Sequence, residues 1–154
     1  MRAMHFRSSR LAVLLISVAL LTSAAAGSAR LSIDIQVDQA WIRWLPAGVQ
    51  GAGYMNVTNT GSTIRTLIGA ASPDYREISF HLSRNNNGMN EMSAVVSIEL
   101  TPHVPVHFAE GGYHLMLMHP TRSIRPGDRV SITLRFADGQ SIVVPFDVRA
   151  GNSA

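Results

Sequence analysis

Cysteine is absent from all 154 residues of the chain. This absence excludes a disulfide framework, and it excludes thiolate ligands of the kind that structural zinc sites and blue-copper redox sites use. It also excludes a lipid-modified cysteine at the end of a leader segment. The fold must therefore be held by packing and hydrogen bonds alone, which a mature domain of about 125 residues can provide.

Lysine is absent as well, so all 13 basic residues are arginines. Three of these arginines lie within the first ten residues, and the remaining ten balance the 10 acidic residues, so the net charge beyond the leader is near zero with histidine neutral. Because no stretch combines clustered arginines with aromatic residues, the sequence does not favour nucleic-acid binding.

The N-terminal segment has the order of a secretory signal peptide. Basic residues occupy the first ten positions, Leu11 to Leu21 is almost wholly apolar, and Ala24-Ala25-Ala26 fits a small-residue cleavage site. The apolar run is about 11 residues long, whereas a membrane-spanning helix needs roughly 20. We therefore expect a signal peptide over residues 1–26 with cleavage between about 26 and 29, export to the periplasm, and no stable membrane anchor afterwards. An uncleaved anchor is the alternative interpretation.

No helical periodicity is found beyond the leader, and the chain instead shows short runs of alternating or β-branched residues. Such runs cover residues 33–37, 54–58, 63–68, 77–82, 95–100, 104–108, 113–118, 130–136 and 142–148. Turn residues separate them, and Asp138-Gly139 gives the strongest hairpin signal. The sequence predicts one all-β domain over residues 30–148, an antiparallel sandwich or Greek-key barrel, followed by a frayed tail over residues 149–154.

Two histidines and two methionines stand out by their spacing, as His81-x10-Met92-x21-His114-x-Met116. Imidazole nitrogen and thioether sulfur form a soft ligand set that suits monovalent copper better than magnesium, calcium or manganese. His114, Met116 and Met118 are two residues apart on a predicted strand, so they share one face. Leu115 and Leu117 would then face the core.

His81 and Met92 are expected to meet across a loop. His81 ends one predicted strand, and Met92 precedes another after a polar loop over residues 83–90. The ends of these strands could approach each other, which would place the site on a rim of loops and strand ends.

The same residues have a purely structural interpretation. Methionine commonly fills cores, and a single histidine is often only hydrogen-bonded. Under this interpretation the chain is an Ig-like adhesion or assembly module that binds no metal.

Three further histidines are candidates for a weak Cu(II) site: His103, His107 and His119. Two tryptophans, Trp41 and Trp44, could either shield a metal site or pack in the core.

The spacing resembles the copper-binding motif of the periplasmic copper chaperones often called the PCuAC family. The resemblance extends over about residues 33–148. It is carried by Ala40-Trp41-Ile42-Arg43, Gly51-Ala52-Gly53-Tyr54-Met55, Asn59-Thr60-Gly61, Gly111-Gly112-Tyr113-His114-Leu115-Met116-Leu117-Met118 and Pro126-Gly127-Asp128.

The resemblance implies a cupredoxin-like β-sandwich that is not an enzyme and that binds one Cu(I) per chain. The implied ligands are His81, Met92, His114 and Met116, and the implied task is copper delivery for cytochrome c oxidase assembly. The partner would be a copper-accepting protein, either an oxidase subunit or another assembly chaperone, and the chain is expected to be a monomer. Leu82 follows His81 where the family often has methionine, and the tail lacks the His- and Met-rich extension of some members.

Overall fold

The structure is a computed structural model that describes residues 33–46 and 50–151. The expected signal peptide over residues 1–26 and the last three residues of the expected tail lie outside the described residues. Within the described ranges, no helix is long and apolar enough to cross a bilayer.

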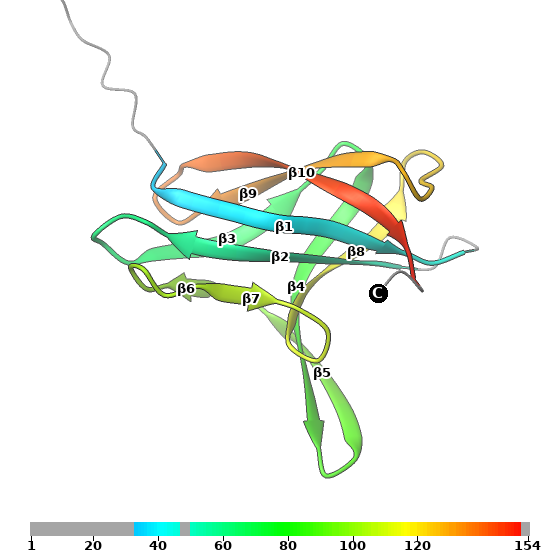
Figure 1. The fold of residues 1–154 in the computed structure, drawn as a ribbon, viewed down its shortest axis with the longest axis horizontal. Coiled ribbons are helices and arrows are strands. Elements are labelled where there is room, and N and C mark those ends of the chain that lie inside the picture. Colours follow the sequence, from blue (N-terminus) through cyan, green and yellow to red (C-terminus); the bar gives the residue numbers. More distant parts are fainter. Residues whose placement is uncertain (1–32, 47–49, 152–154) are drawn as a thin grey trace, which may run out of the picture. The chain divides into compact units, whose positions relative to one another are not determined.

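Ten strands form one hydrogen-bonded sheet in the described part of the chain, in the order β5-β4-β8-β7-β2-β1-β10-β9-β3-β6, with β8 also paired to β2 (Figure 1). They are β1 (Ile35–Trp44), β2 (Gly51–Asn59), β3 (Arg65–Ala71), β4 (Tyr75–Asn86), β5 (Met89–Val95), β6 (Ile98–Leu100), β7 (Val106–Phe108), β8 (Tyr113–Pro120), β9 (Arg129–Phe136) and β10 (Ser141–Ala150). The all-β prediction is confirmed.

The sheet encloses a single hydrophobic core, because period-2 alternation gives nearly every strand one apolar face. In β9 this alternation is regular, with Val130, Ile132 and Leu134 fully buried between exposed or half-buried neighbours. Every strand other than β5 contributes a buried side chain to the same cluster. Strands near opposite ends of the order, such as β4 and β3, therefore pack against one core, as expected for a sandwich.

The predicted hairpin at Asp138-Gly139 is confirmed, since β9 and β10 are antiparallel neighbours on either side of it. Gly139 has a φ of +83°, a left-handed conformation that glycine adopts without strain. β10 continues past residue 148, since Arg149 and Ala150 pair with Arg43 and Trp44 in the parallel β1–β10 ladder.

The prediction of a polar loop over residues 83–90 is wrong. These residues belong to a β-hairpin in which β4 continues to Asn86 and β5 begins at Met89. Asn87 and Gly88 have φ values of +52° and +85°, the two positive angles of a type I′ turn. The hairpin projects from the rest of the sheet (Figure 1), so both of its faces are largely exposed and the sequence shows no buried–exposed alternation there.

The predicted strand over residues 95–100 is also corrected. It is divided into the end of β5 at Val95 and the short β6, which begins at Ile98. β5 pairs with β4, whereas β6 pairs with β3 at the opposite edge of the strand order. The chain thus crosses from one edge to the other within a stretch that reads as one apolar run.

Replacement of Gly88 by alanine should loosen this hairpin without unfolding the domain. An added Cβ at Gly88 meets no atom within 4 Å, so the cost is backbone strain at positive φ, about 1–2 kcal/mol. Amides of residues 89–95 should then exchange hydrogen about tenfold faster, while core amides of β9 keep their protection.

Gly139→Ala is the matched control, since Gly139 also has open space and a positive φ but joins two strands of the core. It should lower global stability and leave the β4–β5 hairpin no looser than the rest of the sheet. Unchanged exchange over residues 89–95 in Gly88→Ala would contradict the turn geometry.

Candidate metal centre

The antiparallel pairing of β4 with β8 places the two motif histidines opposite each other. His81 is the direct partner of His114, and their ring centroids are 5.8 Å apart at an interplanar angle of 31°. Two residues along the same ladder, Ser79 is opposite Met116. Met116 therefore shares the face of both histidines, because directly opposed residues in a ladder project to the same side.

The other face of β8 belongs to the core, as predicted. Leu115 and Leu117 are fully buried, and Phe80 of β4, opposite Leu115, is buried with them. The histidines are thus on the outer face of the sheet, although His114 itself is only 9% exposed.

Met92 reaches this outer face from β5, where it is the ladder partner of Ser83. Ser83 is two residues from His81 on the same strand, so Met92 lies one diagonal step from the His81–His114 pair. Its side chain is 53% exposed. The four motif residues therefore share one face of three adjacent strands, within paired strands rather than at the strand ends that the sequence suggested.

The two histidines are hydrogen-bonded in different ways. Nδ1 of His114 is 3.2 Å from the backbone carbonyl oxygen of Gly112. Nε2 of His81 is 3.0 Å from the hydroxyl oxygen of Ser79, and Nδ1 of His81 is buried without a hydrogen-bond partner. Each ring thus has one nitrogen within hydrogen-bonding distance of a protein group and one nitrogen that makes no such contact.

The electrostatic setting favours neutral imidazole at His81. Burial lowers the pKa of His81 below its ordinary value, and the neighbouring His114 lowers this pKa further when it is charged. A neutral imidazole has the lone pair that a metal ion requires.

A cavity of about 240 Å³ lies beside the His81–His114 pair. Its lining includes His114 and Met92 together with Arg43, Ala52, Tyr54, Ser83, Glu110 and Gly111. Arg43 donates a hydrogen bond of 2.6 Å to Glu110 and stacks over the ring of Tyr54, 5.7 Å from its centroid. This ion pair links β1 to the loop that precedes β8.

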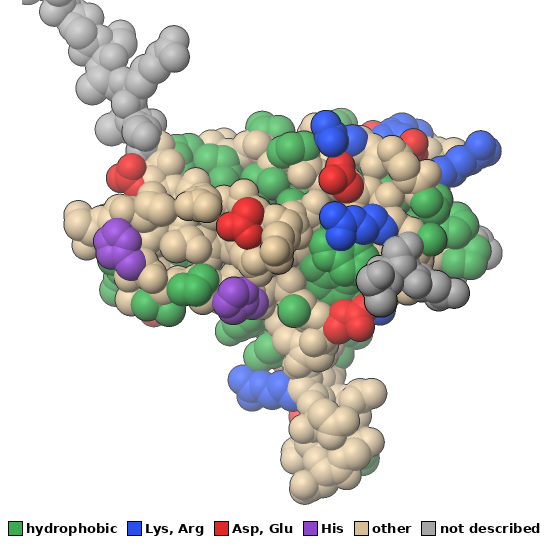
Figure 2. All heavy atoms as spheres, viewed as in Figure 1, with side chains coloured by type: hydrophobic (Ala, Val, Ile, Leu, Met, Phe, Trp, Pro, Cys, Tyr) green, Lys and Arg blue, Asp and Glu red, His purple; other side chains and the backbone are tan. Residues whose placement is uncertain are grey.

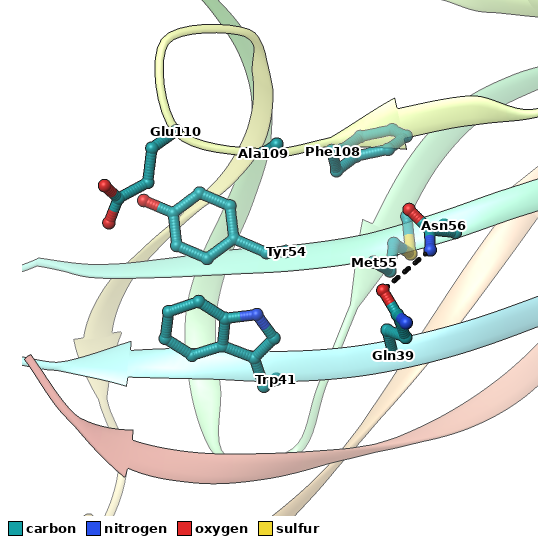
Figure 3. A pocket seen from close by; sticks show the side chains of 8 residues that line it. All are labelled: Gln39, Trp41, Tyr54, Met55, Asn56, Phe108, Ala109 and Glu110. Atoms are coloured by element: carbon teal, nitrogen blue, oxygen red, sulfur yellow. Dashed lines mark hydrogen bonds between the residues drawn. The ribbon is translucent and has the colours of Figure 1, made fainter. Parts of the chain in front are cut away.

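A second cavity of about 280 Å³ adjoins the first, since Tyr54 and Glu110 line both. In Figure 3 the rings of Trp41 and Tyr54 lie side by side, and their centroids are 4.8 Å apart. At the other end of this cavity, Asn56 donates a hydrogen bond of 3.0 Å to Gln39. The cavities next to the histidines are therefore lined by aromatic and polar side chains, and Glu110 among them is paired with Arg43.

His107 and Trp44 do not join this centre. His107 is hydrogen-bonded to Asn56 at 2.8 Å, and Trp44 donates to the carbonyl of Ile124 at 2.7 Å while packing against the core. On the face shown in Figure 2, the visible histidines lie apart and charges of both signs are interspersed. Over residues 33–46 and 50–151, no three His, Asp or Glu side chains gather as a metal-binding group.

Sequence reasoning missed Ser79, which contacts His81, and the Arg43–Glu110 pair, which lines the cavity beside His114. Ser79 could have been found, because it is two residues from His81 and so shares its face on a strand. The Arg43–Glu110 pair could not, because these residues are 67 positions apart and no local pattern connects them.

Residues 35–148 match the model of the family described as "Putative lipoprotein LpqE-like". The chain belongs to this family, which is the PCuAC family. A relative from Leifsonia xyli subsp. xyli, "Putative lipoprotein Lxx21020", is 32% identical over 116 residues, which cover 75% of this chain and 69% of that protein.

Solved PCuAC structures share the fold. The "Copper-bound PCuAC domain from PmoF2" aligns with a TM-score of 0.64 and 26% identity, over 76% of this chain and 93% of that one. The Cu(I) form of DR1885 from Deinococcus radiodurans aligns with a TM-score of 0.57 and 26% identity, over 80% and 83%. The predicted cupredoxin-like β-sandwich is confirmed.

The lowered pKa of His81 predicts acid sensitivity of the metal-free protein. The unfolded chain binds a proton at His81 near pH 6.5, before the folded chain does, so the free energy of unfolding should fall as pH decreases below about 6.5. The loss should stop once pH is below the folded pKa. Chemical denaturation at several pH values measures this, and His81→Gln should remove this part of the slope. A pKa of His81 above 6.5 by NMR titration would contradict the account.

Proposed function

We propose that the mature chain is a metallochaperone that binds one Cu(I) through His81, Met92, His114 and Met116. The observation that carries the proposal is the opposition of His81 and His114 on the outer face, with a thioether on each side. Four uncharged ligands leave the full positive charge on the ion, and soft sulfur favours the monovalent state of copper. Family membership and the copper-bound PCuAC relatives support the same assignment.

The exposure of the ligands suggests how copper is released. Met92 is 53% exposed on an edge strand, whereas His114 is nearly buried. An incoming acceptor ligand can therefore displace Met92 first, while the histidines and Met116 still hold the ion. Exchange then proceeds stepwise, and copper never has to enter water as a free ion.

Ligand chemistry and the relatives support export to an oxidising compartment. Thioether and imidazole ligands do not form disulfides, so the site tolerates an oxidising space such as the periplasm. The leader expected over residues 1–26, and the description of the family and of the Leifsonia protein as lipoproteins, support export. We propose that the acceptor is a copper site of cytochrome c oxidase or another of its assembly chaperones.

Anaerobic Cu(I) titration against a chromogenic chelator tests the binding site. The wild-type mature chain should take up one equivalent of Cu(I). Met92→Leu/Met116→Leu should lose more than about a hundredfold in affinity, because losing two direct ligands should cost more than the loss of an outer-shell partner does. Leucine fills a similar volume, so stability should change little.

Met89→Leu and Met118→Leu are the matched controls, since neither thioether belongs to the proposed set. Both should titrate like the wild type. If the wild-type chain takes up no Cu(I), or if the double variant binds as tightly as wild type, the chaperone function is refuted and the adhesion or assembly module becomes the better interpretation.

Copper transfer tests the chaperone role separately. The Cu(I)-loaded chain, mixed anaerobically with a soluble copper-site domain of an oxidase subunit, should lose its copper to that domain. Met92→Leu should transfer faster than wild type, because the first ligand to be displaced is already missing. Retention of copper by the wild-type chain at equilibrium would contradict delivery to this acceptor.

A further inference from the structure

His81 and His114 each make one local contact, but they make it through different ring nitrogens. Each ring contacts a group two residues earlier in the sequence, which is Ser79 for His81 and Gly112 for His114. The nitrogen that makes the contact differs, since it is Nε2 in His81 and Nδ1 in His114. The nitrogens left over for copper therefore differ as well.

The tautomer of His114 is set by the backbone. A carbonyl oxygen can only accept, so Nδ1 of His114 must carry the hydrogen that it donates to Gly112, and Nε2 is left with a lone pair. The same carbonyl accepts the backbone N–H of Ser83 at 3.0 Å, which fixes its position across the β4–β8 ladder. This support does not depend on any side chain.

The tautomer of His81 depends on a hydroxyl, which can donate or accept. If Ser79 donated to Nε2, the hydrogen of the neutral ring would be on Nδ1, where it would be a buried donor without a partner. If Ser79 accepts from Nε2, the buried Nδ1 has only an unshared lone pair. A buried donor left unpaired is the rarer and costlier arrangement.

We propose that Ser79 is a positioning residue that holds His81 as the Nε2–H tautomer, so that Cu(I) is bound by Nδ1 of His81 and Nε2 of His114. The inference rests on the proposed Cu(I) site and adds to it a mixed pair of nitrogen ligands and the side chain that selects one of them. Ser79 is half-buried opposite Met116, which places its hydroxyl on the ligand face of the ladder.

Long-range ¹H–¹⁵N NMR spectra of the histidine rings test the tautomers directly, in the metal-free protein. Nδ1 of His81 should show the shift of an unprotonated imidazole nitrogen, and so should Nε2 of His114. After addition of one equivalent of Cu(I), these same two nitrogens should shift most. A hydrogen on Nδ1 of His81 in the metal-free protein, or a copper-induced shift centred on its Nε2, would overturn the inference.

Variants at Ser79 test its role as distinct from packing. Ser79→Ala should mix the tautomers of His81 and weaken Cu(I) binding about tenfold, the lower range for a lost second-shell bond. Ser79→Thr keeps the hydroxyl and should restore both readouts. Ser131→Ala is the control, because Ser131 is an exposed serine on β9, outside the β5–β4–β8 ladder, and should leave both readouts unchanged.

The outcomes separate this inference from the proposed function. If the wild-type chain binds Cu(I) but Ser79→Ala keeps the wild-type tautomer and affinity, Ser79 has no positioning role and the chaperone function stands. If Ser79→Ala lowers only thermal stability, its role is structural and the inference is likewise overturned. If the wild-type chain binds no Cu(I), the proposed function and this inference fail together.

Discussion

The register of the β4–β8 ladder is the constraint on which the centre depends. With His81 opposite His114, Phe80, Leu115 and Leu117 face the core, and the ligand candidates face outward. A slip by one residue would turn the leucines to solvent and bury the histidines, because the side-chain period of a strand is two. The free energy of burying this apolar set thus also fixes the positions of the imidazoles. The proposed metal centre needs no disulfide, since burial of the core side chains sets the positions of its residues.

The strands around this ladder differ in how firmly they are held, and the difference suits exchange of an ion. β8 lies between β4 and its neighbours β7 and β2, so His114 and Met116 belong to the interior of the sheet. β5 is an edge strand of a projecting hairpin with exposed side chains, and it supplies only Met92. Local opening of the hairpin would remove one of the proposed ligands while the other three keep their places. Three proposed ligands on paired inner strands and one on an exposed edge strand could hold an ion and still release it.

Sequence reasoning predicted the fold class, most strands and the shared face of His114 and Met116, because alternation reports burial directly. It missed β5, since Met89 to Ala94 are exposed on both faces and carry no alternation. For the same reason it placed Met92 after a loop rather than inside a ladder. The contacts around the site were harder to predict, because His114 is hydrogen-bonded to the backbone carbonyl of Gly112 and the Arg43–Glu110 pair in the cavity lining depends on tertiary structure. Register across distant strands cannot be read from one strand alone.

X-ray absorption at the copper edge of the Cu(I)-loaded mature chain tests the central claim most directly, because it reports the atoms bound to the ion rather than the strength of binding. The account predicts one ion with a mixed shell of two nitrogen and two sulfur neighbours, and a shell that loses sulfur in Met92→Leu/Met116→Leu. A wild-type shell of nitrogen and oxygen alone would show that the thioethers only pack against the sheet. That result would contradict the four-residue site, whatever the affinity of the chain for copper.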